Sequence, residues 1–330
     1  MTRVAIDAMG GDRAPAEIVK GAVLAQSTGC SIILVGQPDV IEAELTACGA
    51  TTSPRLSIVR SDDVVAMDES PAAVVRSRRS TSMSVALELV KHGEADAAVS
   101  AGNSGAMMGL AMRTLGRIKG IERPAIATVF PTPTGEETVL LDSGANVDCS
   151  PENLLQFALM GNEFARGVLN VRQPRVAILS IGEESSKGNA VTKEAAILLG
   201  GADLRFIGNI EGGRLFTGDA DVIVCDGFVG NVALKVAEGT AEFVQAILVR
   251  EFRASPWRIS LGRLCQPIFQ ALKARTDYDQ RGGAPLLGVN GVVIISHGRS
   301  NAKAILNAVR EADEAVKHSV VCRISAAVGS

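Results

Sequence analysis

Short runs of β-branched and aliphatic residues recur along the whole chain, with little polar alternation inside each run. Such runs are typical of strands that are covered on both faces, as in a mainly parallel sheet. On this pattern we predict strands at residues 4–6, 31–36, 56–59, 96–100, 125–130, 138–142, 175–182, 204–208, 221–226 and 292–296.

Segments with the helical period lie between these runs, and two of them carry clear end signals. Ser150 stands where a helix N-cap is expected, and Pro151 follows at the first helical position. Gly93 ends the segment SVALELVKHG, where a left-handed residue is favourable. Strand and helix alternate almost throughout, which predicts an α/β fold built on a mostly parallel sheet with helices on both faces.

No repeat, low-complexity tract or Pro/Gly/Ser-rich linker divides the chain. We therefore predict a single α/β domain over residues 1–330, with a helical extension at roughly residues 232–280. The longest irregular stretch lies at residues 61–82.

The composition narrows the functional classes. A formal net charge of −3 gives no overall attraction to nucleic acid, and 3% aromatic residues leave few surfaces on which bases could stack. No apolar run reaches the roughly 18 residues of a membrane span, and the N-terminus lacks the pattern of a secretory signal. We predict a cytoplasmic protein that does not bind nucleic acid. Six scattered cysteines, none close to a histidine in sequence, suggest neither a metal site nor a disulfide framework.

Polar, glycine-rich loops follow six of the predicted strands, at residues 8–15, 100–106, 142–152, 180–189, 225–231 and 296–301. Any one of them could be only a tight turn, because Gly and Asn favour turns. In a single parallel sheet, however, all six would meet at the carboxyl edge, where ligands bind. Glycine-rich loops at helix N-termini present amides and the positive helix end to anions, so a phosphate group is the favoured ligand.

Signatures of nucleotide binding are missing from these loops. The first one, DAMGGD, is not GxGxxG, and no acidic residue stands about twenty positions further on. GNSGAMMG lacks the GK[ST] ending of a P-loop. A small phosphate group or free phosphate is therefore favoured over a nucleotide.

Eight segments resemble a known family: AIDAMGGDRAP, RSRRSTSM, VSAGNSGAMM, LLDSGANVDCSPENLLQFALMG, IGEESSKGN, VIVCDGFVGNVALK, GGAPLLGVNG and HGRSNAKAILNAV. Together, and in order along nearly the whole chain, they resemble the phosphate acyltransferases of bacterial phospholipid synthesis. Ser80 and Arg299 depart from that pattern, in which an acidic residue and a small hydroxyl residue are expected.

The resemblance implies an enzyme that converts fatty acyl–acyl carrier protein and inorganic phosphate to acyl phosphate. It implies no cofactor, because the thioester is itself activated. It also implies a homodimer with loose peripheral attachment to the cytoplasmic membrane face. The implied fold is related to isocitrate and isopropylmalate dehydrogenases and to phosphotransacetylases.

For such a reaction the loops offer a set of candidate residues. We predict that phosphate binds at the backbone of Gly102 to Gly105 with the side chains of Asn103 and Ser104, and at Ser300 and Asn301. His297 could protonate the leaving thiolate or donate to phosphate, although a packed structural role is the alternative. Lys187 could supply countercharge, or be an ordinary surface lysine, and Asn231 could donate to phosphate or the oxyanion.

Other polar residues near the same loops have competing interpretations. Asp7, Asp142 and Asp226 end strands and are expected to orient loops rather than act as bases. Cys149 and Cys225 could carry an acyl group in a two-step route, but neither has a neighbouring histidine in sequence.

A basic segment with an apolar face runs from residue 250 to residue 275. Trp257, Leu261, Leu264 and Ile268 recur at helical spacing, and Pro267 is expected to kink or divide the helix. The face could pack in the core or against a second subunit. Alternatively it could contact an anionic membrane or the acidic carrier protein, through Trp257 and the arginines Arg258, Arg263, Arg78 and Arg79.

Two other functions compete with acyl transfer. A dehydrogenase of the isopropylmalate type would need carboxylates around a divalent metal and a nucleotide loop, and the sequence offers no convincing set of either. A non-catalytic membrane scaffold for lipid enzymes would not need so many polar strand-end loops.

Overall fold

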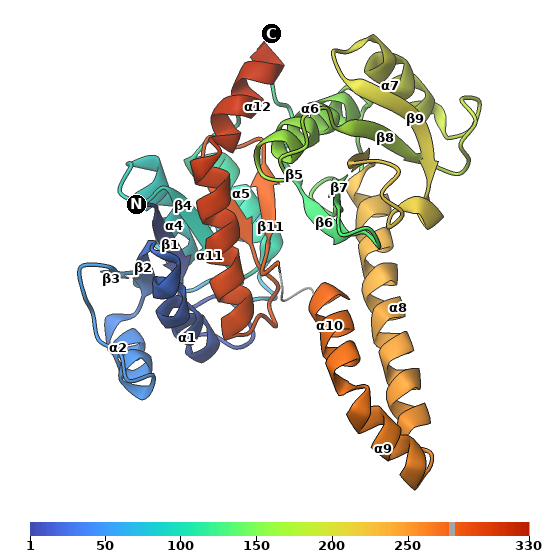
Figure 1. Ribbon diagram of the computed structural model, residues 1–330. Helices are drawn as coiled ribbons and strands as arrows, with labels where there is room; N and C mark the ends of the chain where they lie inside the picture. Colours follow the sequence, from blue (N-terminus) through green and yellow to red (C-terminus); the bar gives the residue numbers. More distant parts are fainter. Residues whose placement is uncertain (277–280, 330) are drawn as a thin grey trace.

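A computed structural model describes residues 1–276 and 281–329. It contains two mainly parallel sheets rather than the single sheet expected (Figure 1). The first sheet has seven strands, in the order β3 (Leu56–Arg60), β2 (Ser31–Gly36), β1 (Arg3–Asp7), β4 (Ala97–Ser100), β12 (Val292–Ile295), β11 (Ala284–Leu287) and β5 (Ala125–Ile126). The second has five, in the order β6 (Thr128–Pro131), β7 (Glu137–Leu141), β10 (Val222–Val224), β8 (Arg175–Ser180) and β9 (Arg205–Glu211).

Antiparallel strands occur only at one side of each described sheet. In the first sheet β11 pairs antiparallel with both β12 and β5. In the second sheet β6 pairs antiparallel with β7. The remaining pairs are parallel, as the continuous apolar runs predicted.

The apolar run at residues 125–130, predicted as one strand, is divided between the two sheets. Residues 125–126 form β5 and pair with β11. Ala127 donates its amide to the carbonyl of Pro285, and Thr128 then begins β6. The prediction of a single strand was therefore wrong. A run of apolar residues indicates that a strand is buried, but it does not indicate the strand with which it pairs.

Helices cover both faces of the first sheet, as predicted. On one face α1 (Ala16–Ala25), α2 (Pro38–Ala47) and α11 (Ala302–Lys317) pack through buried side chains such as Ile6, Ile18 and Ile305. On the other face lie α3 (Pro71–Ser77), α4 (Ser82–Lys91) and α5 (Ser104–Thr114), with Val99 and Ala98 pointing to opposite cores because strand side chains alternate.

The second sheet is covered more fully on one face than on the other. α6 (Pro151–Gly167), α7 (Ala190–Gly201) and α12 (Val320–Gly329) bury Phe157, Leu199 and Ile324 against it. The opposite face, which includes Phe130 and Ile223, meets the start of α8 (Gly227–Arg253).

The predicted helical extension projects from the body as a pair of helical arms (Figure 1). α8 is 27 residues long and leads to α9 (Pro256–Leu264) and α10 (Gln266–Thr276), which run back toward the body. The break between α9 and α10 lies just before Pro267, which confirms that this proline accompanies a division of the helix. Helix α8 itself begins at Gly227, and its first turn is packed on the body, where Gly227 and Gly230 are buried. Residues 277–280 of the predicted extension lie outside the described residues.

The end signals read from the sequence are confirmed. The Ser150 hydroxyl accepts the amide of Asn153 at the start of α6, with Pro151 in the first turn. Gly93 adopts φ 71° just after α4. No helix in the described part of the chain is long and apolar enough to cross a bilayer.

Candidate functional site

The six glycine-rich loops form two groups of three instead of sharing one edge. The loops after β1, β4 and β12 belong to the first sheet, and those after β7, β10 and β8 belong to the second. The expectation of one shared edge was therefore wrong, because it assumed one sheet. Each group nevertheless lies at the carboxyl ends of parallel strands, where ligands bind in this architecture.

The loops of the first group touch one another through glycines. A Cβ placed on Gly10 would lie 2.3 Å from Asp7 Oδ2 and 3.1 Å from the Cα of Gly102, so glycine at this position allows the two loops to approach closely. Gly11, at φ +116°, places its hypothetical Cβ 3.3 Å from the carbonyl oxygen of Gly298, and Asp12 donates its amide to the same oxygen at 2.8 Å. The loops at residues 8–15, 100–106 and 296–301 therefore converge.

Asp7 holds two of these loops in place. Its carboxylate accepts the Ser100 hydroxyl at 2.7 Å and the Met9 amide at 3.2 Å, while Ser100 Oγ accepts the Gly102 amide at 3.1 Å. Burial raises the pKa of the Asp7 carboxyl above its ordinary value. The contacts confirm that Asp7 orients loops, as predicted.

Asn103 is the N-cap of α5, and its side chain is fully engaged. Oδ1 accepts the Ala106 amide at 3.0 Å, and Nδ2 donates to the carbonyls of Met67 and Glu69 at 2.9 and 3.0 Å. The predicted phosphate loop therefore offers backbone more than this side chain. The amides of Ser104 and Gly105, in the first turn of α5, have no acceptor among the described residues and are suited to an anion.

The N-terminus of α11 is already occupied by protein groups. Asn301 Oδ1 accepts the Ala304 amide at 3.0 Å, and Glu17 Oε2 accepts the Ala302 amide at 2.7 Å. A carboxylate at this helix end disfavours a second anion. Ser300 is buried, and its hydroxyl has no partner in the part of the chain that the structure describes. Of the two predicted phosphate positions, the α5 terminus is the more open.

His297 and Arg299 lie in the loop that follows β12. His297 is exposed, and its Nδ1 accepts the Arg299 amide at 3.1 Å, which orients the ring. Both residues line a cavity of about 2170 Å³ that also borders Ser180 at the end of β8. This cavity therefore connects the first group of loops with the second sheet.

The wall of this cavity is mostly apolar. Side chains from β6 and from the arms α8–α10 contribute Phe130, Val232, Leu248, Phe252 and Phe269. Its polar part includes Arg281, whose guanidinium pairs with Glu137 of β7 and, at 2.9 Å, with Glu311 of α11. Sequence reasoning missed this cluster, because its three members are brought together only by long-range packing.

Asp142 organises the second group of loops. Its Oδ1 accepts the amides of Ile126, Gly144 and Ala145, and its Oδ2 accepts both the amide and the side-chain Nδ2 of Asn146. The Gly227 amide then donates to the Asn146 carbonyl at 2.7 Å. Asp226 caps α8 by accepting the Val229 amide at 2.8 Å. These contacts confirm the expectation that both aspartates orient loops.

Asn231 and Lys187 lie on the second-sheet side. Asn231 is in the second turn of α8, where it packs against Gly144, rather than at the helix terminus itself. Lys187 is exposed in the loop after β8, and its amide donates to the Glu184 carbonyl at 2.9 Å. Among the described residues, neither of them is part of the lining of the cavity that His297 borders.

The two cysteines near the loops are unsuited to nucleophilic attack. Burial raises the pKa of the Cys149 thiol to about 11, and it raises that of Cys225 well above the ordinary value. The reactive form of cysteine is the thiolate, which is then scarce at neutral pH. The acyl-cysteine route is disfavoured on this ground.

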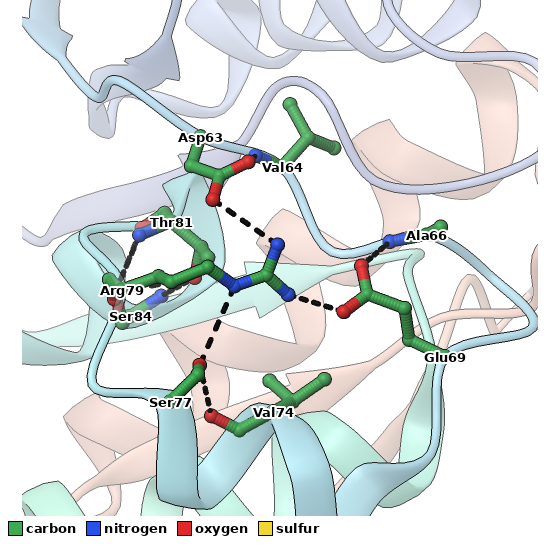
Figure 2. A network of polar contacts seen from close by, with 9 residues as sticks. All are labelled: Asp63, Val64, Ala66, Glu69, Val74, Ser77, Arg79, Thr81 and Ser84. Atoms are coloured by element: carbon green, nitrogen blue, oxygen red, sulfur yellow. Dashed lines mark hydrogen bonds and ion pairs between the residues drawn. The ribbon is translucent and has the colours of Figure 1, made fainter.

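The basic residues that were predicted to contact a membrane or the carrier protein differ in their exposure and in their ion pairs. Arg79 lies between Asp63 and Glu69 and pairs with both (Figure 2). Arg78 is exposed at the end of α3. Arg258 pairs with Glu251 at 3.0 Å and lies over the Trp257 ring at 5.7 Å.

Trp257 begins the outer turn of the arms, where α8 gives way to α9 (Figure 1). Its side chain is 66% exposed, and Leu264 and Ile268 are 78% and 68% exposed. Arg263 points instead toward the cavity between the arms and the body. The apolar face predicted from the sequence is therefore open in the single chain.

Comparison with known proteins places the chain. A family model described as "Fatty acid synthesis protein" matches residues 2–323. The chain belongs to this family. It is 50% identical to a phosphate acyltransferase of Heliobacterium modesticaldum, over 98% of this chain and 96% of the relative. It is 49% identical to a phosphate acyltransferase of Dictyoglomus turgidum, over 96% of this chain and 95% of the relative.

Solved structures support the fold at lower identity. A phosphotransacetylase from Streptococcus pyogenes matches with a TM-score of 0.62 and 20% identity, over 100% of this chain and 94% of that one. A 4-hydroxythreonine-4-phosphate dehydrogenase from Klebsiella pneumoniae matches with a TM-score of 0.57 and 12% identity, over 96% of this chain and 99% of that one. The expected likeness to phosphotransacetylases is confirmed, whereas that to isocitrate and isopropylmalate dehydrogenases stays a prediction.

Within residues 1–276 and 281–329 no three His, Cys, Asp or Glu side chains are grouped so that they could hold a metal ion.

Proposed function

We propose that the chain transfers the acyl group of fatty acyl–acyl carrier protein to inorganic phosphate, for phospholipid synthesis. The observation that carries the proposal is the identity of about half of all residues, over nearly full length, with proteins named phosphate acyltransferase. The open N-terminus of α5 supports it, since free amides at a helix start suit a phosphate.

The proposed reaction does not require a covalent bond between the protein and the acyl group. A phosphate oxygen attacks the thioester carbonyl, a C–O bond forms, and the C–S bond breaks as its electron pair passes to sulfur. The carrier thiolate then takes a proton. The enzyme must hold phosphate against the carbonyl, stabilise the oxyanion and exclude water.

We assign these tasks to the loops of the two sheets. Phosphate binds to the amides at the start of α5, between Gly102 and Gly105, with the Ser104 hydroxyl beside them. Ser300 and Asn301 border the same group of loops. His297 faces the cavity and supplies the proton to sulfur. Asn231 and Lys187 approach from the second sheet as donors to the oxyanion or to phosphate.

The apolar cavity beside His297 suits the acyl part of the substrate. Its wall of aliphatic and phenyl side chains, from β6 and α8–α10, removes hydrocarbon from water. We propose that the fatty acyl chain lies along this wall while its thioester reaches the loop at residues 296–301.

We further propose that the chain forms a homodimer and attaches peripherally to anionic membranes. Phe243 of α8, which is 64% exposed and is not part of the cavity lining, is available to a second copy. The outer turn combines Trp257 with the exposed Arg250 and with Arg258, which lies over the Trp257 ring, and this mixture favours an anionic lipid surface. Arg78 and Arg258 remain candidates for contact with the acidic carrier protein.

One assay tests the proposed reaction. The protein is mixed with long-chain acyl carrier protein, with and without inorganic phosphate, and the released carrier thiol is measured. Hydroxylamine traps the acyl phosphate in parallel. We expect thiol release that requires phosphate and equals the trapped product. Absence of release, or release that is independent of phosphate, would refute the proposal.

A further inference from the structure

A short segment crosses the start of α5, and we call it the strap, residues 63–70. Asn103, the N-cap of α5, donates its side-chain amide to the strap at the carbonyls of Met67 and Glu69. Directly after the strap, Pro71 lies so close to α5 that a Cβ on Gly105 would sit 2.7 Å from its Cγ. The strap therefore covers the same first turn whose amides are open to an anion.

The strap also reaches the loop that follows β12. The terminal methyl of Met67 lies 2.8 Å from the position that a Cβ on Gly298 would take. Met67 is 41% exposed, so its other side faces solvent. Met67 thus touches the loops at residues 100–106 and 296–301 at once, with part of its side chain in solvent.

Arg79 fastens the two ends of the strap to each other (Figure 2). One guanidinium nitrogen pairs with Asp63 at 3.1 Å and the other with Glu69, while Nε donates to the Ser77 hydroxyl at 3.4 Å. Asp63 accepts the Val64 amide, and Glu69 accepts the Ala66 amide at 2.9 Å. Each carboxylate thus binds Arg79 and the strap backbone at once, so the arginine sets the shape of the strap.

The backbone of Arg79 is anchored as well. Its carbonyl accepts the hydroxyl of Ser84 at 3.1 Å, and Ser84 belongs to the capping box that starts α4 together with the buried Thr81. The strap is therefore held from a rigid helix terminus and not only by its own contacts.

We propose that Arg79 is a positioning residue for acyl transfer to phosphate, acting through the strap and Met67 to close the phosphate site against water. The inference rests on the proposed function and deepens it. The carboxylates of Asp63 and Glu69 neutralise the guanidinium of Arg79, so this arginine offers no unpaired positive charge to an acidic carrier protein. The forked guanidinium is needed, because separate nitrogens reach Asp63, Glu69 and the Ser77 hydroxyl, whereas the ammonium of lysine has a single nitrogen.

The test compares R79Q and R79K with a matched control, R60Q. Arg60 forms an exposed ion pair with Asp62, just before the strap, with side chains 76% and 73% exposed. For R79Q we expect the KM for phosphate to rise roughly tenfold, with the KM for acyl carrier protein unchanged. We also expect a larger share of released thiol without trapped acyl phosphate, because water enters. R79K should resemble R79Q, and R60Q should resemble the wild type.

Four outcomes are decisive. A rise in the KM for acyl carrier protein alone would overturn the inference and make Arg79 a docking residue. Wild-type kinetics and an unchanged ratio of transfer to hydrolysis in R79Q would also overturn it. If R79Q proves too unstable to assay, the E69Q variant, which keeps the acceptor for the Ala66 amide, must show the same change in ratio. A wild type without phosphate-dependent release would instead count against the proposed function itself.

Discussion

Single residues at strand ends decide how the loops of the site are held. Asp7 and Asp142 each close a parallel strand, and each accepts amides from the loop that it begins. Their positions were visible in the sequence. The number of hydrogen bonds that each carboxylate accepts could not be predicted. The donors to Asp142 are brought to it by the fold of the following turn and, for the Ile126 amide, by another strand.

Replacing Asp142 by Asn is expected to destabilise the protein. Five N–H groups of the loop and of Ile126 point at the carboxylate, and an amide nitrogen would face some of them as a second donor. We expect a loss of about 2–4 kcal/mol in the free energy of unfolding, from denaturant titration. Asp226→Asn is the matched control, because an N-cap Asn replaces Asp with a change below about 0.5 kcal/mol. Equal losses in both variants would contradict the role given to Asp142.

The role of His297 can be measured at the same scale. If it protonates the leaving thiolate, His297→Gln should lower kcat by about 100-fold or more, since general acid catalysis typically contributes that much. The KM for phosphate should change little. His92→Gln, at the exposed end of α4, is the control and should keep wild-type kcat. A wild-type kcat in H297Q would remove His297 from the mechanism.

The sequence identified the loops of the site better than the roles of their side chains. Asn103 and Asn301 were expected to bind phosphate, yet both cap helices with their side-chain oxygens. The carboxylate on α11 comes from Glu17, about 285 positions away. Arg79 was expected to meet a partner and instead pairs within the chain. Such choices depend on contacts between distant segments, which a local pattern cannot contain.

At the scale of elements, helix α8 is tightly packed at its N-terminal end, whereas most of its remaining length is exposed. Gly230 lies against the backbone of Asp142, where a Cβ would collide with the carbonyl oxygen. Gly239, nine positions further along the same helix, has no atom within 4 Å of a hypothetical Cβ. Gly227 is packed in the same way, since a Cβ there would lie 2.7 Å from the Asn146 carbonyl oxygen. Close packing of the helix start on the second group of loops therefore relies on Gly227 and Gly230.

This contrast gives a paired prediction. Gly230→Ala should lower the free energy of unfolding by more than about 2 kcal/mol, because backbone must move to relieve the clash. Gly239→Ala should raise it by about 0.5–1 kcal/mol, since alanine favours a helix interior over glycine. Thermal and denaturant unfolding of the two variants will show whether each substitution lowers or raises the free energy of unfolding. A stabilising Gly230→Ala would show that the helix start is not packed as described.

Most elements of the chain could be predicted from its apolar pattern. The run at residues 31–36 corresponds to β2 in full, and those at residues 56–59 and 292–296 match β3 and β12 within one residue. β11, which contains Pro285, was not predicted, and the run at residues 125–130 was assigned to one strand instead of two. Both differences lie where the chain passes between the sheets, and pairing there is set by distant strands.

For the whole molecule, the arms α8–α10 provide a reporter of the proposed membrane contact. Trp257 is the single tryptophan of the chain and stands at the outer turn. Anionic vesicles should shift its fluorescence emission to shorter wavelength, and vesicles of neutral lipid should not, because Arg258 lies over its ring and favours an anionic surface. Reversing Arg250 and Arg258 to Glu should abolish the shift without unfolding, because both side chains are at least partly exposed. An equal shift with neutral vesicles would contradict an electrostatic contribution.

The number of sheets could not be predicted, although the α/β class could. Alternating strands and helices fix the class, but the same alternation suits one long sheet or two shorter ones. Two sheets form because β5 and β11 pair antiparallel at the edge of the first sheet, while β6, which follows β5 in the chain, pairs with β7 in the second sheet. The cavity beside His297 lies where the chain makes this change.

The strand order of the first sheet also determines the order in which the two sheets can be completed while the chain is being synthesised. β4 pairs with β12, and Val292 follows Ser100 by 192 residues in the chain. At about 5–20 residues per second, one edge of β4 waits roughly 10–40 s on the ribosome for its partner. All five strands of the second sheet have by then been made. The middle of the chain can therefore complete its sheet first, while the N-terminal half keeps an open strand edge that nascent-chain chaperones would need to shield.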